Sequence, residues 1–281
     1  MRTWFITGAS KGLGLEFTRA ALTRGDRVAA AARTSGGLGE LAAEHGDRLL
    51  VLPLDVTDRA AVLGAVDRAA ATIGLDIVVN NAGIASYGFL EEFTEEQARA
   101  QLETNFFGTL WVGQAVLPHL RARGAGHIVQ ISSIGGLVGH AAVGLYAAGK
   151  WALEGMSEAL AMEAAPFGVD VTIVELGGYW TDLYTSMLAT EPMPQYADQR
   201  AGLEKSFAEN SVDSDPALAA EALLTLVDSD DPPLRLLLGN LAYDTAFAAC
   251  RQRMAVWSGW ESVSRAAERG IADPAGQEAA R

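Results

Sequence analysis

The sequence predicts an α/β protein, a doubly wound parallel sheet of about seven strands with helices on both faces. Short apolar runs alternate along the chain with longer segments in which apolar residues recur at helical spacing. The runs are apolar at successive positions, as strands buried on both faces must be. This alternation is typical of parallel sheets joined by crossover helices. A chain of 281 residues is long enough for one such domain.

The elements follow one another without a linker or a low-complexity segment, so residues 1–281 are expected to form a single domain. Strands are expected at 3–7, 27–32, 48–54, 76–80, 127–132, 170–176 and 234–239. Helices are expected at 12–24, 58–73, 95–123, 146–167 and 217–228. Two segments depart from the alternation: a long insertion at 177–215, and a helical extension at 240–281.

Composition excludes several classes of partner. The chain carries 35 acidic and 21 basic residues, a net charge of −14, which argues against binding to nucleic acid or an anionic membrane. Its start shows no secretory h-region and no apolar run reaches the length of a membrane span, so a cytoplasmic protein is expected. Cys250 is the single cysteine, and the four histidines show no metal-ligand spacing, so no metal is expected.

A glycine-rich turn follows the first expected strand. Gly8, Gly12 and Gly14 stand between that strand and a helix, where the backbone must turn sharply and approach a ligand without a Cβ in the way. The free N–H groups of the helix N-terminus favour an anion such as a pyrophosphate. Ser10, Lys11 and Leu13 lie in the same turn and are expected to contact the nucleotide. Tight turns also use glycine for structure alone, but this position favours a dinucleotide site.

The end of the second expected strand distinguishes between two cofactors. NAD sites place an acid there, which binds the ribose 2′-hydroxyl. The sequence has no acid between Val28 and Gly39, and Arg33 stands where a cation would meet a 2′-phosphate, with Lys11 as a second. The sequence therefore favours NADP(H) over NAD(H), although Arg33 is also compatible with a solvated loop.

Tyr146 and Lys150 stand four residues apart on an expected helix, so they share one face. A nearby ammonium favours the phenolate and lowers the pKa of a tyrosine toward the working pH, as a proton-transfer group requires. Ser133 ends the fifth expected strand and could hydrogen-bond a substrate oxygen. Taken singly, each residue also has a purely structural interpretation; their order behind a nucleotide-binding turn favours catalysis.

These motifs together resemble the short-chain dehydrogenase/reductases, in the single-domain subgroup with TGxxxGxG and YxxxK. The resemblance covers about residues 3–240. It rests on TGASKGLG, LDVTD, NNAG, TNFFG, ISSIGG, the Tyr146–Lys150 pair and LGGYWTD. It implies a Rossmann fold and a dinucleotide cofactor. It also implies a homodimer or homotetramer, assembled through the helices at 95–123 and 146–167.

The resemblance also implies roles for individual residues. The catalytic group would be Asn105, Ser133, Tyr146 and Lys150, with Asn105 holding a water that links Lys150 to solvent. The residues implied to bind the cofactor elsewhere are Asp55 and Val56 at the adenine, Asn81, Ala82 and Gly83 beside the sheet, and Gly177 and Thr181 at the nicotinamide. Two positions depart from the family pattern: Leu176 replaces the usual proline, which leaves the path of the nicotinamide loop open, and Gly149 stands where serine is common.

The insertion at 177–215 is rich in large apolar residues and forms either a substrate pocket or a satellite core. The residues expected in a pocket are Tyr179, Trp180, Leu183 and Met187, with His140 from the loop before Tyr146. A loop this long in a compact domain is usually functional, which favours the pocket. The extension at 240–281 either covers that pocket or caps the domain.

The function expected is hydride transfer between NADP(H) and a carbonyl or alcohol of a fairly apolar small molecule, with Tyr146 as general acid/base. Two alternatives remain. Sugar-nucleotide epimerases and dehydratases share YxxxK, but use TGxxGxxG and a larger C-terminal domain, which this chain lacks. A non-catalytic cofactor-sensing regulator would typically lose the tyrosine or the lysine, and both are present.

Overall fold

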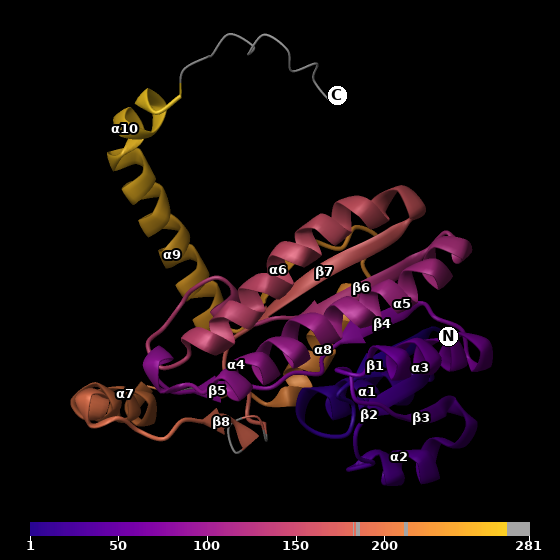
Figure 1. Ribbon diagram of the computed structural model, residues 1–281. Coiled ribbons are helices and arrows are strands. Elements are labelled where there is room, and N and C mark those ends of the chain that lie inside the picture. Colours follow the sequence, from indigo (N-terminus) through magenta and orange to yellow (C-terminus); the bar gives the residue numbers. More distant parts are fainter. Residues whose placement is uncertain (182, 184–185, 211–212, 269–281) are drawn as a thin grey trace.

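The structure is a computed structural model that describes residues 1–181, 183, 186–210 and 213–268. A seven-stranded parallel sheet forms its centre, in the order β3-β2-β1-β4-β6-β7-β9 (Figure 1). The strands are β1 (Thr3–Thr7), β2 (Arg27–Ala32), β3 (Leu49–Pro53), β4 (Ile77–Asn80), β6 (Gly126–Ile131), β7 (Val169–Leu176) and β9 (Arg235–Leu238). The doubly wound parallel sheet predicted from the sequence is confirmed.

The chain changes direction across the sheet between β1 and β4. Phe5 of β1 pairs with Ala29 of β2 on one side and with Val78 of β4 on the other. Strands β2 and β3 extend the sheet one way, and β6, β7 and β9 extend it the other way. Ligands of open α/β sheets bind at such a switch point, beyond the carboxyl ends of the strands. The glycine-rich turn after β1 lies at this point.

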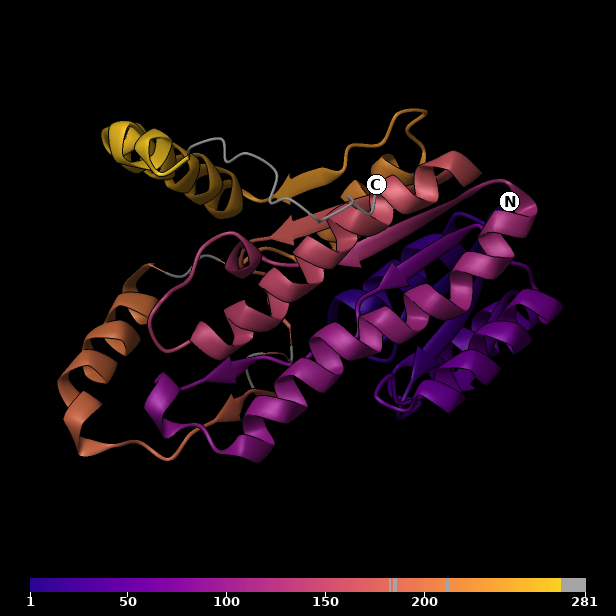
Figure 2. The same ribbon diagram turned by 45° about the horizontal axis from the view of Figure 1, so that its top comes forward.

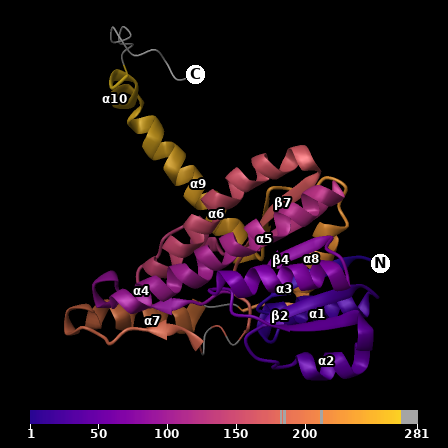
Figure 3. The same cartoon turned by 45° about the vertical axis from the view of Figure 1, so that its right-hand side comes forward.

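Helices cover both faces of the sheet (Figure 3). On one side lie α1 (Gly12–Thr23), α2 (Leu38–His45) and α8 (Pro216–Val227), and on the other lie α3 (Arg59–Thr72), α5 (Gly108–Arg123) and α6 (Gly144–Ala164). Each side has its own apolar core. Trp4 and Phe17 belong to the first core, and Phe5, Val112 and Leu120 belong to the second. Alternate residues of β1 thus enter opposite cores, which explains its uninterrupted apolar sequence.

The segment expected to form one helix at 95–123 is divided. It comprises α4 (Glu95–Leu102), a π-helical turn (Glu103–Phe107) and α5. Such turns often occur at functional sites, and this one contains Asn105, which is 1% exposed. Helix α2 was not expected, because its eight residues LGELAAEH show too short a pattern to separate helix from loop.

The insertion at 177–215 contains regular structure where the sequence indicated an irregular segment. A two-residue strand β8 (Leu188–Ala189) pairs in parallel with β5 (Ser86–Tyr87), and helix α7 (Ala197–Asn210) follows. Figure 2 shows α7 on the side toward which the sheet strands point. The insertion therefore lies near the carboxyl ends of the strands, where the switch point places the ligand site.

Glu92 fastens this insertion to the loop after β5. Its side chain is fully buried and accepts hydrogen bonds from Thr190 Oγ1 at 2.7 Å, Met193 N–H at 2.9 Å and Arg200 Nη2 at 2.5 Å. Burial alone would raise the pKa of Glu92, but these hydrogen bonds bring it down to about 2. The carboxylate therefore stays charged through the physiological range and keeps the insertion attached.

The C-terminal part forms α9 (Asn240–Gly259) and α10 (Glu261–Ala266), which extend away from the sheet (Figure 1). The first turns of α9 pack on the body through Ala242 and Ala246. None of the described residues of α9 lines the central cavity. The rest of the extension, 269–281, lies outside the described residues. Within the described part of the chain, no helix has the length and apolarity needed to cross a bilayer.

Candidate active site

A cavity of about 890 Å³ opens at the carboxyl ends of the central strands. Most residues predicted for the site line it: Gly8, Ser10, Lys11, Gly12, Leu13, Arg33, Asp55, Val56, Asn81, Ala82, Gly83, Ser133, Tyr146, Lys150, Gly177, Tyr179, Thr181 and Leu183. The cavity thus joins the glycine turn, the ends of the sheet strands, α6 and the start of the insertion. Five predicted residues do not line it: Gly14, Asn105, His140, Trp180 and Met187.

The glycine turn packs directly against the Asn81–Gly83 turn. A Cβ on Gly8 would lie 2.9 Å from Ala82 Cα, and one on Gly14 would lie 2.3 Å from the Gly8 carbonyl oxygen. The Asn81 Nδ2 amide donates to the carbonyls of Thr7 and Gly8, at 3.0 and 3.2 Å. The backbones are therefore as close as they can be, and glycine at 8 and 14 is a packing requirement. Gly14 therefore does not line the cavity but allows the two turns behind its wall to pack closely.

The start of α1 presents free backbone donors to the cavity. The helix begins at Gly12, and its N-cap residue, Lys11, makes no side-chain cap hydrogen bond. Lys11 and Arg33 are exposed on the cavity wall, and neither forms an ion pair within the described residues. Amide donors, two unpaired cations and a glycine-lined wall fit the pyrophosphate and an additional phosphate of a dinucleotide.

The catalytic candidates meet at the inner end of the cavity. Tyr146 and Lys150 come from α6, and Ser133 comes from the segment after β6. The Ser133 hydroxyl lies close enough to Tyr146 to lower the pKa of its phenol, and Ser133 Oγ accepts from the Gly135 N–H at 3.1 Å. Lys150 Nζ donates to the Ile131 carbonyl at 2.7 Å and lies 5.8 Å from the Tyr146 ring centroid. The structure therefore brings together three of the four predicted catalytic residues.

The electrostatics of this group differ from the expectation. Burial raises the pKa of the Tyr146 phenol, and the hydrogen bond with Ser133 offsets part of the rise. Burial lowers the pKa of Lys150 to about 8, against an opposing effect of Glu154. A lowering of the tyrosine pKa by Lys150 was expected and is not found, because Nζ is bonded to a backbone carbonyl and lies over the ring. The phenol is thus protonated at neutral pH, as a proton donor must be.

The side chain of Asn105, the fourth predicted catalytic residue, is hydrogen-bonded to the backbone of Ile84. Its Oδ1 accepts from the Ile84 N–H at 2.8 Å, and its Nδ2 donates to the Ile84 carbonyl at 2.9 Å. The π-helical turn aims the side chain inward, so Asn105 holds the loop that follows Gly83. A water between Asn105 and Lys150 stays a prediction.

The residues expected in the substrate pocket separate into two groups. Tyr179 and Leu183 line the main cavity. Trp180 is 74% exposed, and Met187, just before β8, lines neither cavity. His140 lines a smaller cavity of about 360 Å³ with Phe89 and Tyr196. Periodicity does not distinguish these side chains within a loop, so their separate directions could not be predicted.

Three residues behind the site were not anticipated. Glu154 on α6, Glu175 on β7 and Arg235 on β9 form a buried ionic cluster next to Ser132. The sequence contains a signal for it, because Glu175 interrupts the apolar end of β7 and Arg235 directly precedes the apolar residues of β9, and buried charges need partners. Among the residues that the structure describes, no group of His, Cys, Asp or Glu has metal-binding geometry.

Comparison with known proteins agrees with this geometry. The family described as "short chain dehydrogenase" matches residues 2–192. The oxidoreductase BOA17 of Botryotinia fuckeliana (strain B05.10) is 38% identical over 273 residues, covering 94% of this chain and 98% of BOA17.

Two solved structures are also similar. A short-chain dehydrogenase from Streptomyces avermitilis has a TM-score of 0.88 and 38% identity, covering 95% of this chain and 98% of its own. A short-chain dehydrogenase from Burkholderia cenocepacia J2315, solved with NADP, has a TM-score of 0.73 and 26% identity, covering 92% and 98%.

The fold and the site define a nucleotide-dependent oxidoreductase. The chain belongs to the short-chain dehydrogenase/reductase family, whose members are NAD(P)-dependent oxidoreductases.

Proposed function

We propose that the protein is an NADP(H)-dependent oxidoreductase that interconverts a carbonyl and an alcohol on a fairly apolar small molecule. One observation carries the proposal: a protonated tyrosine, with a serine hydroxyl close by and a buried lysine next to it, lines the cavity that the glycine turn also lines. This arrangement supplies a proton donor where a substrate oxygen would bind.

In the proposed reduction of a carbonyl, Ser133, Tyr146 and Lys150 have separate roles. A nicotinamide cofactor bound in the cavity would supply the hydride. Ser133 hydrogen-bonds the substrate carbonyl oxygen, and the Tyr146 hydroxyl donates its proton to that oxygen as negative charge develops on it. The Lys150 ammonium, which lies 5.8 Å from the Tyr146 ring centroid, would bind the ribose hydroxyls of the cofactor. In oxidation of an alcohol, the same proton returns to Tyr146.

The cavity wall next to the catalytic group supports an apolar substrate. Ile84, Leu176 and Leu183 line it beside Tyr179. Apolar walls with a few placed polar groups are typical of sites for small organic molecules.

Screening reductase activity with NADPH over ketones, quinones, steroids and polyketide-like carbonyls tests the proposal. We expect NADPH oxidation with at least one apolar carbonyl compound. Tight NADPH binding without turnover of any carbonyl would favour the cofactor-sensing regulator, and release of a rearranged sugar nucleotide would favour the epimerase. The intact Tyr146–Lys150 pair argues against the first, and the TGASKGLG turn, which differs from TGxxGxxG, argues against the second.

Replacing Arg33 with aspartate should reverse the cofactor preference. The change removes a cation from the expected 2′-phosphate position and adds an anion there, so the KM for NADPH should rise about 10- to 100-fold. The KM for NADH should change little or fall. Steady-state kinetics with both cofactors measures this, with Arg68→Asp on the exposed side of α3 as the charge-matched control. Equal use of NADPH and NADH by the wild type would contradict the NADP(H) assignment.

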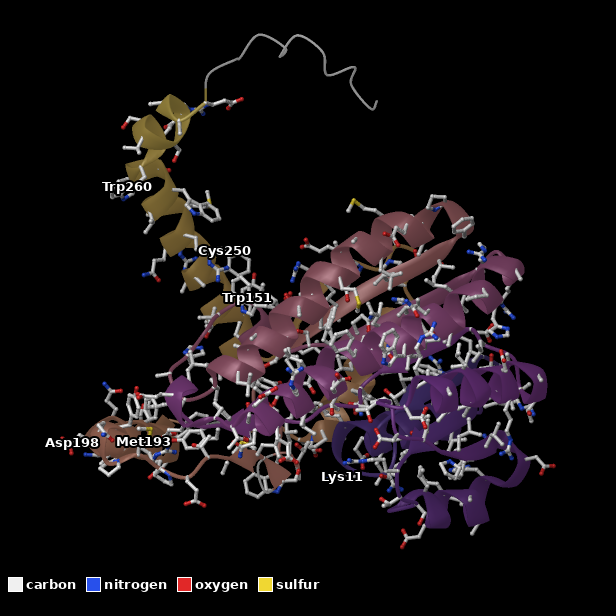
Figure 4. The ribbon with its side chains drawn as sticks, in the orientation of Figure 1. Lys11, Trp151, Met193, Asp198, Cys250 and Trp260 are labelled. Carbon is white, nitrogen blue, oxygen red and sulfur yellow. The ribbon has the colours of Figure 1, made fainter. Side chains whose placement is uncertain are left out.

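We also propose that the chain assembles as a homo-oligomer and that α9 contributes to the contact. Beyond its first turns α9 carries exposed apolar side chains in a 4-3-4-3 spacing: Tyr243, Phe247, Cys250, Met254 and Trp257. Figure 4 shows Cys250 on this projecting helix and Trp260 at the junction of α9 and α10. Tyr243 and Trp257 each stand seven residues from Cys250, so two copies related by a two-fold axis there would place Tyr243 against Trp257 of the other copy. A net charge of −14 disfavours an anionic lipid surface as the alternative occupant.

Phe247→Asp should therefore shift the protein to a smaller oligomer or a monomer in sedimentation velocity, because burying a charge in the contact between two α9 helices is costly. Gln252→Asp, on the polar side of α9, serves as control and should not shift it. Mild oxidation should link two chains through Cys250, the chain's single cysteine. A wild-type monomer at all concentrations, or vesicle binding by a monomer, would contradict the contact. The helices 95–123 and 146–167 remain predicted as further contacts.

A further inference from the structure

A buried ionic cluster lies directly behind the catalytic group. Glu154 and Glu175 are 3% and 1% exposed, and both accept hydrogen bonds from Nη1 of Arg235, at 2.6 Å for Glu154. Arg235 Nη2 donates to Glu158 at 2.7 Å on the more exposed side. Three separate elements, α6, β7 and β9, supply these residues. Two buried carboxylates on one guanidinium are an expensive way to stabilise a fold, which suggests a functional reason for the arrangement.

Glu154 contacts the segment that carries Ser133. The Ser132 hydroxyl donates to Glu154 Oε1 at 2.5 Å, with both groups buried. Ser132 also continues the sheet, because its N–H donates to the Val174 carbonyl at 2.8 Å. A Cβ on Gly136 would lie 1.9 Å from Glu154 Oε1, so glycine at that position leaves room for the carboxylate. The carboxylate thereby holds the Ser132 end of the short turn that carries Ser133 and packs against its other end at Gly136.

Glu154 also acts on Lys150. The two residues are four apart on α6 and therefore lie on one face of that helix. Burial lowers the pKa of Lys150 to about 8, and the negative charge of Glu154 opposes this. The other titratable groups that face Glu154 in the described structure are Glu158 on its own helix, Arg235 on β9, and Glu175 on β7, whose pKa burial raises to about 7. Of these groups, Glu154 is the one whose effect keeps Lys150 protonated.

We propose that Glu154 is a positioning residue for the reaction: it fixes the Ser132–Ser133 segment, maintains the charge of Lys150, and is itself held by Arg235. The proposal rests on the proposed oxidoreductase function. It assigns two separable effects to one carboxylate, a geometric effect through Ser132 and an electrostatic effect through Lys150. A cluster that only stabilises the fold would produce neither.

Glu154→Gln separates these possibilities. Without the carboxylate charge, Lys150 loses its proton at lower pH, so the alkaline limb of the kcat profile should move down by roughly one pH unit. NADPH affinity, measured by fluorescence titration across the same pH range, should weaken at correspondingly lower pH, because the ammonium is placed to bind the ribose. Glu158→Gln is the matched control: it binds the same guanidinium from a half-exposed position, and both profiles should stay where they are.

Ser132→Ala tests the geometric effect and does not depend on folding of the Glu154 variant. This variant keeps the charge of Glu154 but removes the hydrogen bond between Ser132 and Glu154, so kcat should fall about tenfold. The alkaline limb of the kcat profile should stay at the wild-type pH. Unchanged pH profiles in folded Glu154→Gln, or unchanged kcat in Ser132→Ala, would overturn the corresponding part of the proposal. If the wild type reduces no carbonyl, the proposed function fails, and the pH dependence of NADPH binding still tests Glu154 independently.

Discussion

Replacing Tyr146 with phenylalanine should remove carbonyl reduction almost completely while leaving NADPH binding intact. The change deletes one hydroxyl, the group proposed to donate the proton and whose pKa the nearby Ser133 lowers. General acid catalysis of this kind contributes about 10²- to 10⁴-fold, so kcat should fall by at least that range. NADPH oxidation with an identified carbonyl substrate measures the loss, and fluorescence titration measures the cofactor affinity.

The control for this experiment is Tyr243→Phe, which deletes a hydroxyl from an exposed residue of α9. It should leave kcat unchanged. A Tyr146→Phe variant that retains kcat near the wild-type value would contradict the mechanism and assign proton donation to another group. Because burial raises the pKa of the phenol, wild-type reduction should not fall at neutral pH through deprotonation of Tyr146.

Gly14→Ala should have the second large effect, on both stability and nucleotide binding. The added Cβ would lie 2.3 Å from the Gly8 carbonyl oxygen and 2.5 Å from Asn81 Nδ2. Backbone cannot move aside as a side-chain tip can, so the two turns must separate. Such overpacking costs about 1–3 kcal/mol of unfolding free energy. It also displaces the first turn of α1, so NADPH affinity should fall by at least tenfold.

Gly64→Ala provides the comparison. Gly64 also lies in a helix, α3, but no heavy atom stands within 4 Å of an added Cβ. Its replacement should raise the unfolding free energy by about 0.5–1 kcal/mol, as expected for glycine to alanine in a helix. Thermal unfolding of the two variants measures the contrast. A Gly14→Ala protein with wild-type melting temperature and NADPH affinity would show that the turns have more room than their geometry indicates.

The sheet could be predicted closely because its strands are buried on both faces and end at turn-forming residues. The strand Thr3–Thr7 begins and ends at the expected residues, and the other six differ by at most one residue at each end. The polar helix α7 could not be predicted, because it shows almost no apolar face to signal helical spacing. The division of segment 95–123 into α4, a π-helical turn and α5 could not be predicted either, because a π-helical turn adds a residue without interrupting the apolar pattern of the sequence.

The site could be predicted where motifs fix the backbone. Gly8, Asn81 and Ser133 meet at the cavity because each follows a strand of one parallel sheet. The links around Glu154 could not be predicted, because they depend on how β9 approaches α6, far apart in sequence. The exposure of Trp180 could not be predicted either, because it depends on how the loop folds. Its apolar side chain indicated burial, but in the structure it is exposed.

The position of Arg235 has a consequence for protein synthesis. Residues 2–192 contain all four predicted catalytic residues, yet the guanidinium that neutralises Glu154 and Glu175 comes from a strand made more than forty residues later. Until that strand is made, two carboxyl groups that are buried in the folded protein have no guanidinium partner and must be protonated or remain in water. We therefore expect an organised active site only after β9 has joined the sheet, and expect a chain truncated before residue 235 to carry the full set of family motifs without one.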